Sequence, residues 1–258
     1  MDMEIAGLRV MVSAGATGIG REIARAFARE GARVHVCDAD AAAVEALRAS
    51  DPALTATRCD VAVRPEVERF FAEGIAALGG LDCFVNNAGI AGPTGKIDEI
   101  DPAEWDRCIA VDLTGQFNCA RLAVPHLRRS ANASLMNVSS LAGRLGFAMR
   151  TPYASAKWGV VGLSRSLAIE LGPDRIRVNA LLPGVVAGER QVRVLTAKAE
   201  ARGISFEEME RLALSYTSLK EYVTPQQLAD LVVFVASPRG RMISGQALSV
   251  CGDTNMLG

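Results

Sequence analysis

The sequence is poor in aromatic residues and contains no long hydrophobic run. Phenylalanine, tyrosine and tryptophan make up 5% of its 258 residues, and no apolar stretch reaches the roughly 18–20 residues that a membrane-spanning helix requires. Residues 1–4 (MDME) also lack the basic residues that begin a secretory signal. We therefore expect no membrane partner and a cytoplasmic location.

Neither sign of charge is in excess. Arginine and lysine number 28 and aspartate and glutamate 29, which gives a formal net charge of −1. Proteins that bind nucleic acid or anionic membranes through their electrostatic field need a surplus of positive charge. The composition therefore argues against a nucleic-acid partner.

Histidine is scarce, and cysteine never occurs in close pairs. The chain has two histidines and six cysteines, and no cysteines follow the Cys-x-x-Cys spacing of metal and redox sites. The cysteines stand singly in apolar segments, at Cys37, Cys59, Cys83, Cys108, Cys119 and Cys251. We expect buried free thiols and no metal site.

What the sequence does contain is a regular alternation of strand-like and helix-like segments. Hydrophobic residues make up 50% of the chain, enough for one compact core. Strands are predicted at 8–12, 33–37, 54–59, 81–85, 135–140, 177–181 and 247–250, and helices at 21–30, 41–49, 65–78, 102–128 and 225–236. This predicts a single α/β domain over residues 1–258, with a doubly wound parallel sheet of about seven strands and helices on both faces.

A glycine-rich turn joins the first strand to the first helix. Residues 13–20 (SAGATGIG) follow the strand and open the helix. Glycines let a backbone approach a pyrophosphate closely, and a helix N-terminus presents free N–H groups and a partial positive charge. This context predicts a dinucleotide site with contacts at Ser13, Gly15, Thr17, Gly18, Ile19 and Gly20.

Asp38 ends the second predicted strand. An acidic side chain there accepts hydrogen bonds from the two adenosine ribose hydroxyls, whereas a 2′-phosphate calls for a basic partner. Thr17 and Ala39 hold positions near a 2′-phosphate and neither is basic, while the sequence alone does not place Arg21 and Arg58. We therefore expect NAD rather than NADP.

Tyr153 and Lys157 are the best candidates for chemistry. They lie four residues apart in YASAK, so on a helix they share one face with Cβ atoms roughly 5–6 Å apart. A nearby ammonium favours the phenolate, so the pair would form a proton-transfer group usable near neutral pH. Ser140 closes an apolar strand whose carboxyl end faces the ligand crevice, and its hydroxyl is suited to hold a substrate oxygen.

Together these features resemble the short-chain dehydrogenase/reductase family in its single-domain form, over nearly the whole chain. The shared motifs are the turn at 13–20, Asp60-Val61, NNAG at 86–89, Ser140 thirteen residues before Tyr153, Tyr-x-x-x-Lys, RVN at 177–179 and Pro183-Gly184. The resemblance implies a Rossmann-like fold with further cofactor contacts at Asp60, Val61, Asn87, Ala88, Gly89, Tyr153, Lys157, Pro183, Gly184 and Val186.

The resemblance also implies the reaction. Tyr153 would exchange a proton with the substrate oxygen, Lys157 would hold the nicotinamide ribose, and Ser140 would orient the carbonyl or alcohol, while hydride passes between NAD and a secondary alcohol or ketone. Asp112 is expected to join this catalytic set. Relatives are commonly tetramers, so a homotetramer is implied.

Three positions depart from the family's pattern. Ala14 stands where the nucleotide turn usually has glycine, which suggests backbone angles that tolerate a methyl group. Asp112 stands where asparagine usually helps to hold a water linked to the lysine; its backbone carbonyl keeps that link, but its carboxylate adds charge near Lys157. Gly188 stands where threonine often binds the cofactor amide, so backbone groups near Val186 would replace it.

Residues 189–222 are the least typical part and are expected to form a helical lid over the substrate. Helices are predicted at 191–201 and 205–216, split by Gly203, with Ser205 and Glu208 as a capping box.

Four arginines lie in segments that could face the pocket, at Arg144, Arg150, Arg190 and Arg193. Arginine binds carboxylates in a bidentate manner. We therefore expect an anionic or polyhydroxylated substrate, such as a hydroxy acid or sugar, contacted by Ser140, Arg144, Arg150 and Arg190. The alternative is that these are solvated surface charges.

Two other functions stay open at this point. One is an NAD(P)H-dependent 3-oxoacyl-type reductase, against which Asp38 argues. The other is a non-catalytic NAD-binding regulatory protein, which only the departures at Asp112 and Gly188 favour.

Overall fold

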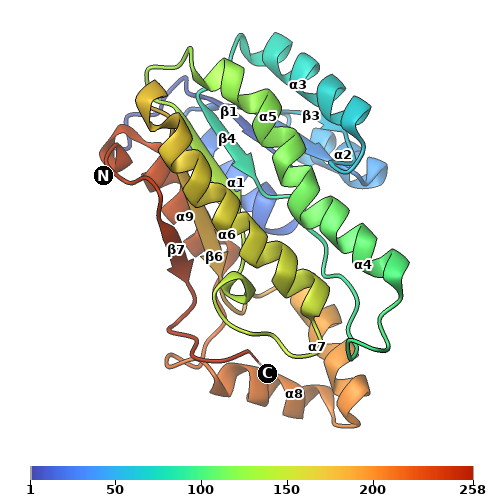
Figure 1. The fold of residues 1–258 in the computed structure, drawn as a ribbon. Coiled ribbons are helices and arrows are strands. Elements are labelled where there is room, and N and C mark those ends of the chain that lie inside the picture. The colour runs from blue at the N-terminus through green and yellow to red at the C-terminus, as the bar shows by residue number, and fades with distance from the viewer. Residues whose placement is uncertain (1, 258) are drawn as a thin grey trace.

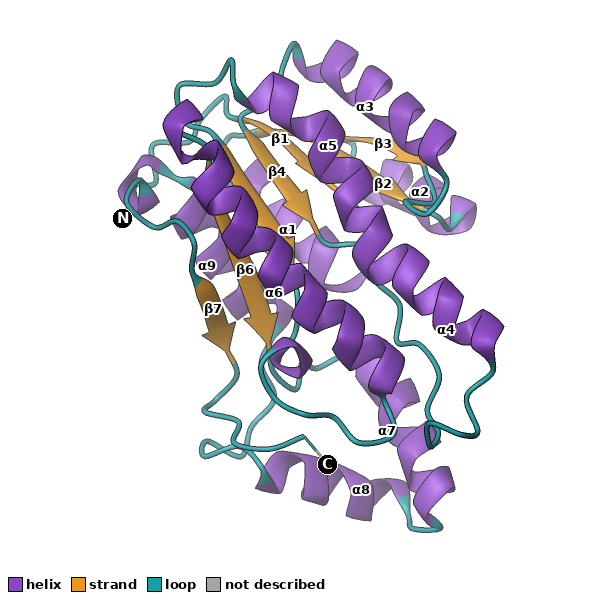
Figure 2. Ribbon diagram, in the orientation of Figure 1, coloured by secondary structure: helices purple, strands orange, loops and turns teal. Residues whose placement is uncertain are grey.

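The centre of the fold is a seven-stranded sheet (Figures 1 and 2). The computed structural model describes residues 2–257. Strands lie in the order β3-β2-β1-β4-β5-β6-β7, and all neighbours are parallel. Their bounds are β1 (Arg9–Val12), β2 (Arg33–Asp38), β3 (Leu54–Arg58), β4 (Cys83–Asn86), β5 (Ser134–Val138), β6 (Arg177–Pro183) and β7 (Ala247–Val250). The predicted fold class is confirmed.

Helices cover both faces of the sheet. They are α1 (Gly18–Arg29), α2 (Ala41–Ser50), α3 (Arg64–Leu78), α4 (Pro102–Ile109), α5 (Gly115–Leu127), α6 (Thr151–Leu171), α7 (Glu189–Arg202), α8 (Phe206–Ser215) and α9 (Pro225–Ala236). One apolar core takes residues from α1, α2 and α9, and a second takes residues from α3, α5 and α6. Figure 1 shows α3, α5 and α6 in front of the sheet. β5 and β6 are buried along their whole length, and most of their residues are apolar.

Strands β1 and β4 lie side by side although β2 and β3 separate them in sequence. The chain leaves β1 toward one edge of the sheet and β4 toward the other. Such a reversal opens a crevice at the carboxyl ends of the two strands, where ligands bind in open α/β sheets. The glycine-rich turn after β1 and the NNAG segment after β4 both lie at this crevice.

The long helix predicted over 102–128 is present over 102–127, with a π-helical turn in its middle that was not predicted. Between α4 and α5, residues Ala110–Thr114 form a π-helical turn. Such turns replace the i→i−4 hydrogen bonds of an α-helix with wider ones and occur mostly at functional sites. The middle residue of this turn is Asp112, so the distortion falls on a position that the sequence had already singled out.

After β6 the chain adds two helices beyond the carboxyl ends of the strands, α7 and α8, which lie at the bottom of Figure 1. Their bounds differ from the predicted ones only at the ends. Ser205 Oγ accepts a hydrogen bond from the Glu208 N–H at 3.1 Å, as an N-cap does. Within residues 2–257, no helix is both long and apolar enough to cross a membrane.

Candidate active site

The glycines of the turn between β1 and α1 are required by close contacts. A Cβ on Gly15 would lie 2.7 Å from the Val36 Cβ, and one on Gly20 would lie 2.1 Å from the Ala14 carbonyl oxygen. Helix α1 begins at Gly18, and its N-cap residue, Thr17, makes no side-chain capping bond. The side chain therefore leaves the first N–H groups of the helix uncapped, which fits a pyrophosphate.

The turn is fastened to the end of β4 by a set of hydrogen bonds. Ser13 Oγ accepts from the N–H groups of Asn87 and Ala88 at 2.9 and 3.0 Å. The Asn87 amide donates in return to the carbonyl oxygens of Ser13 and Ala14 at 3.1 and 3.0 Å. Three of the predicted cofactor contacts, Ser13, Asn87 and Ala88, therefore lie together and hold the two walls of the crevice in register.

Ala14 adopts φ +50°, in the left-handed region. This conformation costs an L-residue roughly 1–2 kcal/mol relative to the right-handed one. The backbone here therefore accommodates the methyl group, as expected, but at this cost. The turn keeps the conformation that glycine adopts freely, and Ala14 bears the strain.

Asp38 ends β2 beside the turn and is half-buried. Burial raises the pKa of its carboxyl group, and hydrogen bonds from the backbone N–H groups of Asp40 and Ala16 oppose that rise. Its register partner on β3 is Arg58, whose guanidinium pairs with Glu66 at 3.6 Å. The arginine opposite Asp38 on β3 therefore pairs with another carboxylate.

Asp60 and Val61 follow β3. Asp60 accepts hydrogen bonds from the Ala62 N–H at 2.9 Å and from Arg107 at 2.8 Å. Burial by itself would raise the pKa of Asp60, but these bonds outweigh it and hold the pKa below its usual value. The Val61 carbonyl accepts from the Asn118 amide at 3.1 Å. These hydrogen bonds hold Asp60 and Val61 in place at the carboxyl end of β3.

Helix α6 brings Tyr153 and Lys157 onto one face, as their spacing predicts. It begins at Thr151 with Pro152 in its first turn, where the missing N–H is not needed. The Lys157 ammonium is buried, lies 5.6 Å from the centroid of the Tyr153 ring, and donates to the Val138 carbonyl at 3.2 Å. The Tyr153 ring and the Lys157 ammonium therefore lie near each other where β5 ends.

Asp112 lies against the same ammonium. Its Oδ2 is 3.4 Å from Lys157 Nζ and makes no hydrogen bond, so the contact is an ion pair without a close bond. Its Oδ1 accepts from the Ile90 N–H at 2.7 Å. A Cβ on Gly89 would lie 3.0 Å from Lys157 Nζ, which is why a glycine precedes Ile90. Asp112 thus ties the segment after β4 to the lysine.

Ser140 lies two residues beyond the end of β5. Its Oγ accepts from the Ala142 N–H at 3.1 Å and caps the short 3₁₀ turn Leu141–Gly143. This bond uses an acceptor lone pair, so the hydroxyl hydrogen is left for another oxygen. The adjacent Ser139 donates to the Lys157 carbonyl at 2.8 Å and fixes the same turn to α6.

The segment from Pro183 to Gly188 leads from β6 into α7. A Cβ on Gly184 would lie 2.7 Å from the Cys251 Cα, so the chain after β7 requires a glycine there. Val186 pairs with Val223 in a β-bridge. Gly188 has φ +139°, which a β-branched residue adopts only under strain. The backbone thus explains why threonine is absent at this position.

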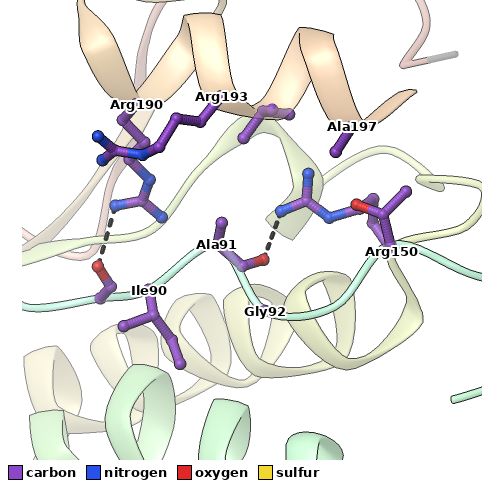
Figure 3. Close-up of a pocket in the computed structure, with 10 residues that line it drawn as sticks. Ile90, Ala91, Gly92, Arg150, Arg190, Arg193 and Ala197 are labelled. Atoms are coloured by element: carbon purple, nitrogen blue, oxygen red, sulfur yellow. Dashed lines mark hydrogen bonds between the residues drawn. The ribbon is translucent and has the colours of Figure 1, made fainter. Parts of the chain in front are cut away.

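A cavity of about 390 Å³ opens between the segment after β4 and helix α7 (Figure 3). Arg190 donates to the Gly89 carbonyl at 2.9 Å, and Arg150 donates to the Ala91 carbonyl. Its lining residues are Gly89, Ile90, Ala91, Gly92, Thr94, Arg150, Arg190, Arg193, Val194 and Ala197. Three of the four arginines named from the sequence therefore face one space.

Arg144 lies elsewhere. It donates to Ser249 Oγ at 3.1 Å and to the Ala247 carbonyl at 2.8 Å, both on β7. It does not line the cavity, so the expectation that it faces the pocket is not met in this structure.

Sequence reasoning missed the residues 90–92 and Phe147. The first group follows the NNAG segment directly, and that position was an available signal. Phe147 lies 5.3 Å from the Arg150 guanidinium carbon, ring centroid to Cζ. Its neighbours in the sequence give no sign of this contact, because the loop that carries it has no regular pattern.

Comparison with known proteins identifies the family. A family model described as Enoyl-(Acyl carrier protein) reductase matches residues 14–253. The chain belongs to the short-chain dehydrogenase/reductase family. Among curated members of that family, a D-beta-hydroxybutyrate dehydrogenase from Cupriavidus necator is 32% identical over 251 residues, which cover 95% of this chain and 97% of the relative. A D-xylose 1-dehydrogenase from Caulobacter vibrioides is 33% identical and covers 93% and 92%.

Solved structures give the same result for this short-chain dehydrogenase/reductase. The crystal structure of a levodione reductase superimposes with a TM-score of 0.90 at 26% identity, covering 96% of this chain and 97% of that one. The predicted family, the Rossmann-type fold and the reaction class, an oxidoreductase of secondary alcohols or ketones that uses a nicotinamide cofactor, are confirmed.

Proposed function

We propose that the protein is an NAD-dependent dehydrogenase that oxidises a secondary alcohol, with Tyr153 as the residue that moves the proton. The observation that carries this proposal is the position of the Tyr153 and Lys157 pair. Both side chains come from α6, and the Lys157 ammonium reaches the end of β5. Asp112 joins Lys157 to the segment after β4, which Asn87 ties to the glycine-rich turn. Cofactor and substrate would meet there.

Each group of the chain would have its own role in the reaction. Ser140, with its hydroxyl hydrogen directed at the substrate oxygen, would hold the alcohol in place, and the Tyr153 phenolate would accept its proton. The buried Lys157 ammonium would stabilise the charge on that phenolate and hold the nicotinamide ribose. The glycine-rich turn and the start of α1 would bind the pyrophosphate. A bound nicotinamide dinucleotide would supply the hydride acceptor.

Asp38 supports NAD over NADP. Its carboxylate ends β2 beside the glycine-rich turn. There it would accept hydrogen bonds from the adenosine ribose hydroxyls, whereas a 2′-phosphate would bring a second negative charge against it. Arg58, the cation beside it on the sheet, is paired with Glu66. The crystal structure of an actinorhodin polyketide ketoreductase with NADPH is similar to this chain, with a TM-score of 0.89 at 30% identity and coverage of 95% of this chain and 96% of that one. Cofactor choice therefore rests on this chain's residues rather than on its fold.

The physiological direction has a second candidate, reduction of a ketone. Reductases as well as dehydrogenases appear among the similar proteins. The proposed use of NAD favours oxidation. Relatives named for a hydroxy acid and for a sugar support the polar substrates expected from the sequence.

Homotetramer formation and a cytoplasmic location stay predictions. Exposed apolar side chains on α5 and α6, Phe117, Trp158 and Ile169, favour an assembly. All six cysteines are free thiols, which suits a reducing compartment.

The proposal is tested by cofactor reduction. Purified protein is incubated with NAD or NADP and a panel of secondary alcohols, sugars and hydroxy acids, and the reduced cofactor is followed by absorbance. We expect kcat/KM to favour NAD at least tenfold, and Asp38→Ala to reduce that preference. Asp40→Ala, which changes the nearby N-cap of α2, is the matched control. Equal use of the two cofactors by the wild type would contradict the assignment.

A further inference from the structure

We propose that the arginine-lined cavity binds a carboxylate group of the substrate, with Arg150 as its main partner and Arg190 at its mouth. The proposal rests on the proposed function, because it names the substrate class of the same site: hydroxy acids and the corresponding oxo acids. Arg150, Arg190 and the cavity that they share carry the argument (Figure 3).

Arg150 is buried, with 2% of its surface exposed. One of its terminal N–H groups donates to the Ala91 carbonyl, and its guanidinium lies between the rings of Phe147 and Tyr153, at 5.3 and 5.1 Å from their centroids. Its Nε is buried and has no hydrogen-bond partner. A buried N–H without an acceptor is costly, and this one belongs to a residue that lines the cavity.

The charges around the cavity also favour an anionic ligand. Among the described residues, no carboxylate lies within ion-pairing distance of Arg150 or Arg190, and the cavity lining contains no acidic side chain. The nearby Asp112 is committed to Lys157 and the Ile90 N–H. Burial lowers the pKa of Arg150, and Arg190 lowers it further. A buried guanidinium without an acidic partner is stabilised by an anion that enters beside it.

A third arginine lines the same space. Arg193 lines the cavity and pairs only at 3.9 Å with the exposed Glu189 of its own helix. With Arg150 and Arg190 it gives the cavity a surplus of positive charge, which favours anions over neutral molecules.

The position of Arg150 fits a substrate that reacts at Tyr153. The guanidinium carbons of Arg150 and Arg190 lie 5.1 and 6.0 Å from the centroid of the Tyr153 ring. A short molecule can therefore place its hydroxyl at Tyr153 and its carboxylate at Arg150. The planar guanidinium matches a planar carboxylate, and the cavity has room for a small acid.

The test uses unreactive probes, so that it does not depend on turnover. Binding of pentanoate and of pentanamide, which have nearly the same shape, is measured by calorimetry on the protein with and without NADH. We expect pentanoate to bind at least tenfold more tightly than pentanamide. Arg150→Met should abolish this preference, and Arg190→Met should reduce it about threefold. Arg144→Met, which removes an arginine held at β7, should leave it unchanged.

Three results would overturn the proposal: equal binding of the two probes, no binding of pentanoate, or a preference that persists in Arg150→Met. Circular dichroism shows whether Arg150→Met folds. If it does not, the test relies on Arg190→Met, because Arg190 is exposed and its replacement should not unfold the protein. A preference for pentanoate without any dehydrogenase activity would uphold the carboxylate site and contradict the proposed function. Turnover of neutral alcohols without a preference for pentanoate would uphold the proposed function and contradict the carboxylate site.

Discussion

Lys157 Nζ lies 3.4 Å from Asp112 Oδ2, and the two side chains are 3% and 0% exposed. The ammonium also donates to the Val138 carbonyl, and the carboxylate accepts from the Ile90 N–H. The pair therefore joins three elements of the site: the end of β5, the segment after β4 and the π-helical turn. Because the family usually has asparagine in place of Asp112, this ion pair is a feature of this chain.

The pair should show strong energetic coupling. Removing one partner of a buried ion pair leaves an uncompensated charge and costs about 3 kcal/mol. We expect Asp112→Asn and Lys157→Met each to lower the free energy of unfolding by about that amount, and the double variant to lose less than the sum by at least about 1 kcal/mol. Urea unfolding of the four proteins gives the coupling. A value near zero would mean that the two charges do not stabilise each other.

Gly188 should not accept the threonine that the family often has there. Its φ of +139° is strained for a β-branched residue, although no atom crowds the position. We expect Gly188→Thr to lower the free energy of unfolding by about 2 kcal/mol and to leave the affinity for NAD no better. Gly146→Thr, at an exposed glycine in open space without a positive φ, is the control. Tighter NAD binding by Gly188→Thr would show that the backbone rearranges.

His35 should make the fold less stable in mild acid. It is buried between Thr55 and Thr57, and burial lowers its pKa from 6.5 to about 4. Between these two values the unfolded chain binds a proton that the folded chain does not. Stability from this group is therefore complete above pH 6.5 and is lost as the pH falls toward 4, by up to about 3 kcal/mol.

The corresponding measurement compares denaturant unfolding at pH 5 and pH 7.5. His35→Gln should have a smaller difference between the two pH values than the wild type. His126→Gln, at the half-buried second histidine, should retain most of it. An unchanged difference in His35→Gln would assign the acid sensitivity to other groups.

Much of the fold could be predicted because its signals are local and repeated. Apolar runs in buried parallel strands are continuous, and the caps at Asp101, Ser205 and Thr224 mark the starts of helices. The strand β7 was predicted with its observed bounds. The π-helical turn was not predicted. Its residue Asp112 contacts Lys157 of α6 and the Ile90 N–H, and these are contacts between distant segments that residue order does not show.

The site likewise has residues that could be predicted from the sequence and residues that could not. Tyr153 and Lys157 could be paired from their spacing, since a helix fixes which residues share a face. The arginines could not be sorted, because their positions depend on loops and on α7. Arg150 is buried beside Phe147, whereas Arg144, six residues earlier, reaches β7. The strain at Ala14 likewise depends on its φ, which the sequence does not state.

The most direct test of the proposed chemistry is turnover by Tyr153→Phe. The substitution removes the phenolic oxygen and keeps the ring that lies among Arg150, Arg190 and Lys157. The account predicts that kcat falls at least about a hundredfold, since positioned proton transfer contributes roughly 10²–10⁴ in rate, while the dissociation constant for NADH stays within about twofold. Turnover in Tyr153→Phe close to that of the wild type would contradict the assignment of the proton transfer to this residue.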